Sequence, residues 1–152
     1  MEQKDLNKIK EAVEEFFEKM TIITSKIEIG FSSADVVDVN IKLEEPQILI
    51  GERGQTLFEI QRLLRTILNK RLQKIFYLNL DINDYKSKKI EYLKGLAKDL
   101  ADEAVLTKEE KVLSPMPAYE RRIIHTELAQ RQDVITESQG EGFDRHIVIK
   151  PR

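Results

Sequence analysis

Two glycines separated by two polar residues, Gly51-Glu52-Arg53-Gly54, constrain this 152-residue chain more than any other stretch. An apolar run at 48–50 precedes them and a helical pattern follows. Glycine adopts positive φ without strain and has no Cβ to keep a ligand at a distance. The helix that begins at Gly54 directs free N–H groups at the turn, which favours an anion such as phosphate. The tetrapeptide alone also fits an ordinary helix–turn–helix, in which Gly51 only ends a short helix.

The flanking segments predict an α+β unit. Residues 1–20 form an amphipathic helix pattern, and alternation predicts strands at 22–31 and 36–43 with a turn at Ser32-Ser33. Glu45-Pro46 opens a short helix that reaches Ile50, because proline suits a first helical turn. A third strand is predicted at 75–82. Between the glycines and that strand, apolar residues at helical spacing predict one buried stripe: Leu57, Ile60, Leu63, Leu64, Ile67, Leu68 and Leu72.

Charge supports a polyanionic ligand only locally. The chain has a net charge of −2, which argues against a general electrostatic attraction to nucleic acid. Residues 48–80 carry six basic side chains against two acidic ones, a net +4: Arg53, Arg62, Arg65, Lys70, Arg71 and Lys74 against Glu52 and Glu59. Arg62 and Arg65 share a helix face and can follow a phosphate backbone. A solvated helix face is the alternative for this pair.

The rest of the chain predicts a second small α+β unit, with the boundary placed between residues 1–83 and 84–152. A long helix is expected at 85–106, with Asp84 as its N-cap and Val105 among its inward residues. A short strand at 111–113, a helix at 117–128 and strands at 134–138 and 146–149 follow. The basic residues of 86–89 are either a solvated helix start or a binding patch.

Arg121 and His125 lie one helical turn apart in this unit, so they project from the same face. Arginine supplies paired donors to phosphate, and the imidazole adds a further one. The same pair on a helix is also common as surface decoration, which is the alternative interpretation.

Both motifs have a known counterpart. Residues 116–128, centred on Tyr119-Glu120-Arg121-Arg122-Ile123-Ile124-His125, resemble an R-three-H (Arg-xxx-His) domain, and the first unit resembles a type II KH domain. The two in this order resemble the bacterial Jag family, also called KhpB or EloR and associated with sporulation stage III protein J. The resemblance implies a type II KH-like domain, with helices on a three-stranded sheet, followed by a small α+β R-three-H domain.

The resemblance also implies a function. Such a protein is expected to be cytoplasmic, to bind single-stranded RNA after transcription, and to be linked to cell elongation and division. A small single-KH protein, or a second copy in a homodimer, is the expected protein partner. Two departures stand out: Glu52 replaces the Lys or other non-acidic residue usual in the family's loop, and the N-terminal Jag domain of longer members has no counterpart before Met1.

We therefore expect phosphates at the glycine loop and at the Arg-xxx-His helix, and bases in an apolar groove beside Ile48 and Ile50. Single-stranded DNA remains a second possible ligand. Phe58 and Tyr119 are candidates for base stacking or for simple rim packing. The predicted RNA-binding residues are Ile48, Ile50, Gly51, Glu52, Arg53, Gly54, Arg62, Arg65, Arg121 and His125.

Other classes of protein find less support in the sequence. The absence of cysteine excludes disulfides, thiolate metal sites and a cysteine nucleophile, and it fits a reducing compartment. No apolar run is long enough for a membrane span, and residue 1 begins a charged helix, not a signal peptide. We expect no cofactor, no metal and no enzymatic activity. A protein-interaction scaffold with little RNA affinity is the alternative function.

Overall fold

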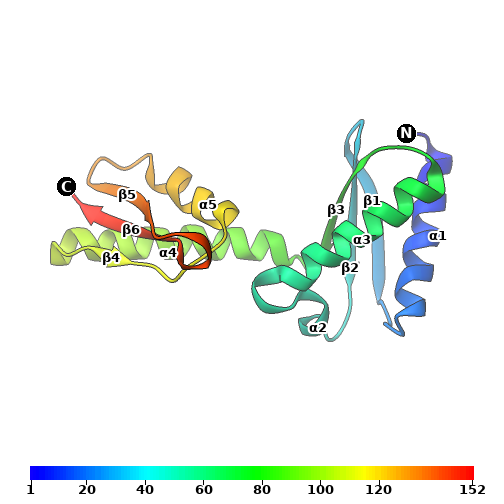
Figure 1. The fold of residues 1–152 in the computed structure, drawn as a ribbon, viewed down its shortest axis with the longest axis horizontal. Coiled ribbons are helices and arrows are strands. Elements are labelled where there is room, and N and C mark those ends of the chain that lie inside the picture. Colours follow the sequence, from blue (N-terminus) through cyan, green and yellow to red (C-terminus); the bar gives the residue numbers. More distant parts are fainter. The chain divides into compact units, whose positions relative to one another are not determined.

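The computed structural model describes all residues, Met1–Arg152, as two compact units, Met1–Lys86 and Ser87–Arg152 (Figure 1). The first unit has the predicted order of helix, strand, strand, helix, glycine turn, helix and strand. Its elements are α1 (Gln3–Lys19), β1 (Lys26–Ser33), β2 (Val36–Lys42), α2 (Gln47–Ile50), a 3-10 turn (Glu52–Gly54), α3 (Gln55–Leu72) and β3 (Tyr77–Ile82).

The strands of this unit form one sheet in the order β1-β2-β3. β1 and β2 are antiparallel, whereas β2 and β3 are parallel, so Val39 lies between Ile29 and Leu80. Helices α1 and α3 pack on the sheet and enclose the core with it (Figure 1). The largest fully buried side chains of this core are Ile9, Phe17, Ile41, Leu57, Leu64, Leu68, Phe76, Leu80 and Ile82.

The outer edge of β3 is occupied by polar side chains of α3. The amide of Leu80 donates to Oε1 of Gln61 at 2.9 Å. Asn69 both accepts from the amide of Phe76 and donates to its carbonyl, each at 3.4 Å. Buried backbone groups need such partners, and here the helix supplies them where a fourth strand would otherwise do so.

Several local predictions for this unit were wrong. The first strand begins at Lys26, not at 22, and it continues through Ser33, so the chain turns at 34–35. A register irregularity between Phe31 and Ser33 accommodates the extra length. On α3, Leu63 is 53% exposed and Ile67 is exposed as well, because the helix faces the sheet only through the narrower stripe of Leu57, Ile60, Leu64 and Leu68.

The second unit places two helices against a small antiparallel sheet in the order β4-β6-β5. Its elements are α4 (Tyr85–Thr107, of which the first two residues belong to the first unit), β4 (Lys111–Val112), α5 (Ala118–Leu128), β5 (Val134–Gln139), a 3-10 turn (Gly142–Asp144) and β6 (His146–Pro151). Alanines at 97, 101 and 104 on α4 are fully buried, which lets the neighbouring elements approach the helix closely. The core also contains Leu93, Leu113, Ile124, Leu128, Val134, Ile147 and Ile149.

Two predictions about α4 were also wrong. The carboxylate that accepts a hydrogen bond from its first turn belongs to Asp81, whose Oδ1 lies 3.1 Å from the amide of Lys86. Asp84, the expected cap, has a left-handed φ of 57°. Val105 is exposed, not turned inward. None of the helices combines the length and the apolar character that crossing a membrane requires.

Candidate nucleic-acid interface

The glycine loop of the first unit has a backbone that requires both glycines. Gly51 has a φ of 71° and Gly54 a φ of 77°. A Cβ on Gly51 would lie 2.1 Å from Oγ1 of Thr56, and one on Gly54 would lie 2.7 Å from Cε1 of Tyr85. The turn therefore packs tightly on these two side chains, and a larger residue at either position would both strain and displace the backbone.

Only part of this loop is available to a ligand. The amide of Gly54 donates to the carbonyl of Gly51 at 3.3 Å, and the amide of Gln55 donates to the carbonyl of Glu52. Gly54 is buried, whereas Glu52 and Arg53 are exposed. The guanidinium of Arg53 makes no ion pair, so it is the cation that the loop presents to solvent beside the start of α3.

Ion pairs reduce the positive charge around the loop. Nη1 of Arg71 lies 3.0 Å from Glu15, and Nζ of Lys74 lies 2.7 Å from Asp5, both on α1. Hydrogen bonds from the backbone of Glu2 and from Lys74 hold the pKa of Asp5 below its usual range, so this carboxylate is charged at neutral pH. Of the six basic residues at 48–80, those that are exposed and make no ion pair are Arg53, Arg62 and Lys70.

Arg62 and Arg65 line one hollow between α3 and β3, with a volume of about 490 Å³. Nε of Arg65 donates to the carbonyl of Phe76 at 3.2 Å, and its guanidinium carbon lies 4.6 Å from the ring centroid of Tyr77. Arg65 is thus held by the strand, while Arg62 remains free at the rim. The hollow is lined by Gln61, Arg62, Arg65, Thr66, Asn69, Tyr77 and Leu78.

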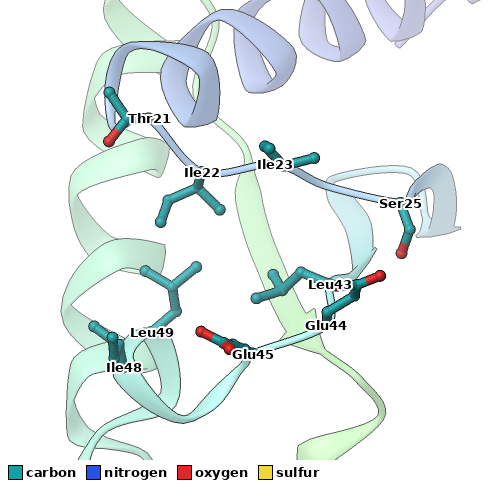
Figure 2. A pocket seen from close by; sticks show the side chains of 9 residues that line it. All are labelled: Thr21, Ile22, Ile23, Ser25, Leu43, Glu44, Glu45, Ile48 and Leu49. Carbon is teal, nitrogen blue, oxygen red and sulfur yellow. The ribbon is translucent and has the colours of Figure 1, made fainter.

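Ile48 borders a different hollow, of about 470 Å³, beside α2 (Figure 2). Its own side chain is 78% exposed, whereas Ile50 is half-buried and packs against the core. The carboxylates of Glu44 and Glu45 belong to the same lining. Apolar side chains from α2, from the segment after α1 and from the segment after β2 face one another across this hollow (Figure 2). The full lining is Thr21, Ile22, Ile23, Ser25, Leu43, Glu44, Glu45, Ile48 and Leu49.

Two members of the basic run at 86–89 make contacts within the fold: Nζ of Lys89 lies 3.9 Å from Oε1 of Glu120, and Lys86 is held more closely. Its Nζ lies 2.7 Å from Oε1 of Gln61 and 2.8 Å from Oδ1 of Asn79, and 5.4 Å from the ring centroid of Phe58. Burial lowers the pKa of Lys86, and the nearby Asp81 opposes this effect. Neither a free binding patch nor a fully solvated helix start describes this residue.

In the second unit, α5 and β5 bring Arg121 and His125 together on hydroxyl groups of the strand. Nη1 of Arg121 donates to Oγ of Ser138 at 3.1 Å, and Nε2 of His125 lies 2.9 Å from the same oxygen. Nδ1 of His125 lies 2.7 Å from Oγ1 of Thr136. Nε of Arg121 donates to the carbonyl of Met116 at 3.2 Å. Both ring nitrogens of His125 are therefore occupied, while Nη2 of Arg121 has no partner.

The surroundings of Arg121 and His125 also determine which of the two side chains is charged. Burial lowers the pKa of His125, and the positive charge of Arg121 lowers it further. His125 is consequently neutral at neutral pH, and Arg121 supplies the positive charge. Thr136 and Ser138 were not recognised from the sequence, although their i, i+2 spacing on β5 places both hydroxyls on one face of the strand.

Comparison with known proteins identifies both units. Residues 8–90 match the KH domain family, and residues 91–151 match the R-three-H domain family. The fold and the sites thus define a protein with a KH domain followed by an R-three-H domain. The chain belongs to the bacterial Jag family, also called the KhpB family.

Three relatives named RNA-binding protein KhpB illustrate the similarity. The protein of Clostridium symbiosum is 36% identical over 140 residues, which are 91% of this chain and 63% of the relative. That of Bacillus subtilis strain 168 is 39% identical, covering 77% and 57%. That of Lactiplantibacillus plantarum is 31% identical, covering 86% and 40%. The chain therefore spans less than two thirds of each relative, and neither the names nor the domains are those of enzymes.

Proposed function

We propose that this protein binds single-stranded RNA through phosphate contacts in both units. In the KH domain, the exposed Arg53 stands at the amino-terminal end of α3, where the helix dipole favours an anion. This unpaired arginine in the glycine loop of a KH domain is the observation that carries the proposal. Arg62 then extends the contact with the backbone along α3.

The bases are best assigned to the hollow between α3 and β3. It combines the ring of Tyr77 with the guanidinium groups of Arg62 and Arg65, and stacking on such groups accepts any base. The hollow beside Ile48 is apolar too, but Glu44 and Glu45 at its border repel a phosphate backbone. This assignment moves the bases away from the groove beside Ile48 and Ile50.

In the R-three-H domain, Arg121 contacts a phosphate through Nη2, the nitrogen that the fold leaves without a partner. His125 acts as a positioning residue, because both of its ring nitrogens are engaged by Thr136 and Ser138. The shared hydroxyl of Ser138 fixes the guanidinium plane. Because the guanidinium group is already oriented by its hydrogen bonds to Met116 and Ser138, less side-chain entropy is lost when it binds a phosphate.

Membership of the family supports a cellular role for the protein. We place it in the cytoplasm, acting after transcription and linked to cell elongation and division, with a small single-KH protein or a second copy as partner. The exposed apolar side chains of Leu63 and Ile67 on α3 offer a surface for such a partner. The same surface, together with the acidic Glu52, favours the second candidate function, a protein-interaction scaffold with little RNA affinity.

Binding of a labelled single-stranded RNA, measured by fluorescence anisotropy between about 50 and 200 mM salt, tests the proposal. Affinity should fall as salt rises, and Arg53→Gln and Arg121→Gln should each flatten the dependence by about one unit or less. Lys8→Gln and Lys108→Gln are matched controls, because each removes one exposed positive charge elsewhere in the same unit. Equal effects of all four substitutions would show that the sites are wrong, and absence of binding at low salt would favour the scaffold.

A further inference from the structure

The turn between β5 and β6 carries an aromatic side chain that contributes nothing to the core. Phe143, in the middle of the 3-10 turn Gly142–Asp144, is fully exposed. A single exposed apolar residue is common on protein surfaces. Here, however, the segment that presents the ring is tightly held, and it adjoins the Arg121 site.

The turn is braced by its own side chains. Nη1 of Arg145 donates to the carbonyl of Gly140 at 2.8 Å, and Nδ1 of His146 lies 2.8 Å from the carbonyl oxygen of Asp144. Gly140 has a φ of 83°, and a Cβ there would lie 2.8 Å from that same oxygen of Asp144. The backbone on both sides of Phe143 therefore has a defined conformation, and the ring is held away from the apolar interior.

Hydrogen bonds connect this turn with the phosphate site. The amide of Met116 donates to the carbonyl of Arg145 at 3.2 Å, and the carbonyl of Met116 accepts from Nε of Arg121. Ser138, which also binds Arg121, is two residues before Gly140 on the strand that enters the turn. In Figure 1 the turn between β5 and β6 lies beside the start of α5.

We propose that Phe143 stacks on an unpaired base of the RNA whose phosphate contacts Arg121, an inference that rests on the proposed function. The ring and the guanidinium belong to one hydrogen-bonded assembly, so one strand can reach both. Stacking on an aromatic ring is tolerant of sequence, because every base has a π face. The R-three-H domain thereby recognises nucleobases as well as phosphates, and a polyanion without bases uses only the Arg121 part of the site.

The chain contains no tryptophan, so Phe143→Trp creates a single tryptophan, whose fluorescence can be excited separately from that of the four tyrosines. Its emission should be quenched on saturation with single-stranded RNA and unchanged on saturation with inorganic polyphosphate, which has the charge but no bases. Leu106→Trp, at a site 84% exposed near the end of α4, is the control whose emission should not respond to either polymer. Phe143→Ala should weaken RNA binding about fivefold or more, and Phe143→Tyr should restore it.

The outcomes separate the two proposals. Unchanged Phe143→Trp emission at RNA saturation, or equal responses to RNA and polyphosphate, would overturn the stacking role while salt-dependent RNA binding upheld the proposed function. If Phe143→Ala bound RNA as tightly as the unaltered protein, the stacking role would also be overturned. That result would be expected if Phe143 mediated self-association instead. If the unaltered protein bound no RNA, both proposals would fall. Because Phe143 packs against nothing in the core, the substitutions test binding and not folding.

Discussion

Arg121 and His125 bind the same hydroxyl group, with Oγ of Ser138 lying 3.1 Å from Nη1 of the arginine and 2.9 Å from Nε2 of the histidine. Since the imidazole is fixed on its other side by Thr136, Ser138 transmits the position of the histidine to the arginine. We predict that Ser138→Ala weakens RNA binding about three- to tenfold, the equivalent of about one hydrogen bond. Anisotropy titrations measure this effect, with the exposed Thr126→Ala of α5 as control. Equal affinities of the two variants would contradict the positioning role.

The titration of His125 gives a second prediction. Burial and the charge of Arg121 should place its pKa below 6.5, and Arg121→Gln should raise it by removing the second cause. Between the lowered pKa and 6.5, the histidine binds more protons in the unfolded chain than in the folded one. The contribution of His125 to the free energy of unfolding is therefore fully present above this window and is lost as the pH falls through it. Imidazole NMR signals followed against pH measure the pKa, and His146→Asn assigns the two histidines. A pKa at or above 6.5 would refute the prediction.

Glu52 provides a test of the glycine loop. Its exposed carboxylate lies next to Arg53 in sequence and opposes an incoming phosphate. Glu52→Gln should therefore raise RNA affinity about two- to fivefold at low salt, the size of a surface charge interaction, and less at high salt, where such interactions are screened. Glu11→Gln, an exposed position on α1, is the control for net charge. If both variants gained equally, the loop would not be the binding site.

The glycines supply a prediction about stability. Gly54→Ala should lower the free energy of unfolding by about 1–3 kcal/mol, because its φ is left-handed and the added methyl would meet Tyr85. Gly95→Ala, in the middle of α4 with open space around it, should raise the free energy by about 0.5–1 kcal/mol. Urea unfolding followed by circular dichroism compares the two variants. Effects of the same sign would contradict this account of the loop.

The order and type of the elements could be predicted from the sequence because periodicity reports directly on burial. Strand alternation in β2 and the spacing of Leu57, Leu64 and Leu68 correspond to buried faces. The turn at Ser32-Ser33 was misplaced because serine is compatible with both a turn and an edge strand, and pairing with β2 decides between them. Leu63 and Ile67 were predicted to be buried because they fit the helical spacing. They are exposed because tertiary packing determines how wide a face of α3 the sheet covers.

The candidate site was less accessible from the sequence, because it depends on contacts between distant segments. Counting charges could not show that Arg71 and Lys74 pair with α1, or that Arg65 is held by Phe76. The i, i+4 spacing placed Arg121 and His125 on one face. Which strand supplied hydroxyls to them could be learned only from the fold.

The hydrogen bonds from side chains of α3 to the backbone at β3 affect how the sheet can pair with another chain. An unpaired strand edge is a template on which another chain can add a strand. On β3 that template is partly occupied, since Gln61 binds the amide of Leu80, and Arg65 and Asn69 bind the backbone of Phe76 just before the strand. Growth of the KH sheet from one molecule to the next, whether orderly or as aggregation, is therefore less hindered at the margin formed by β1.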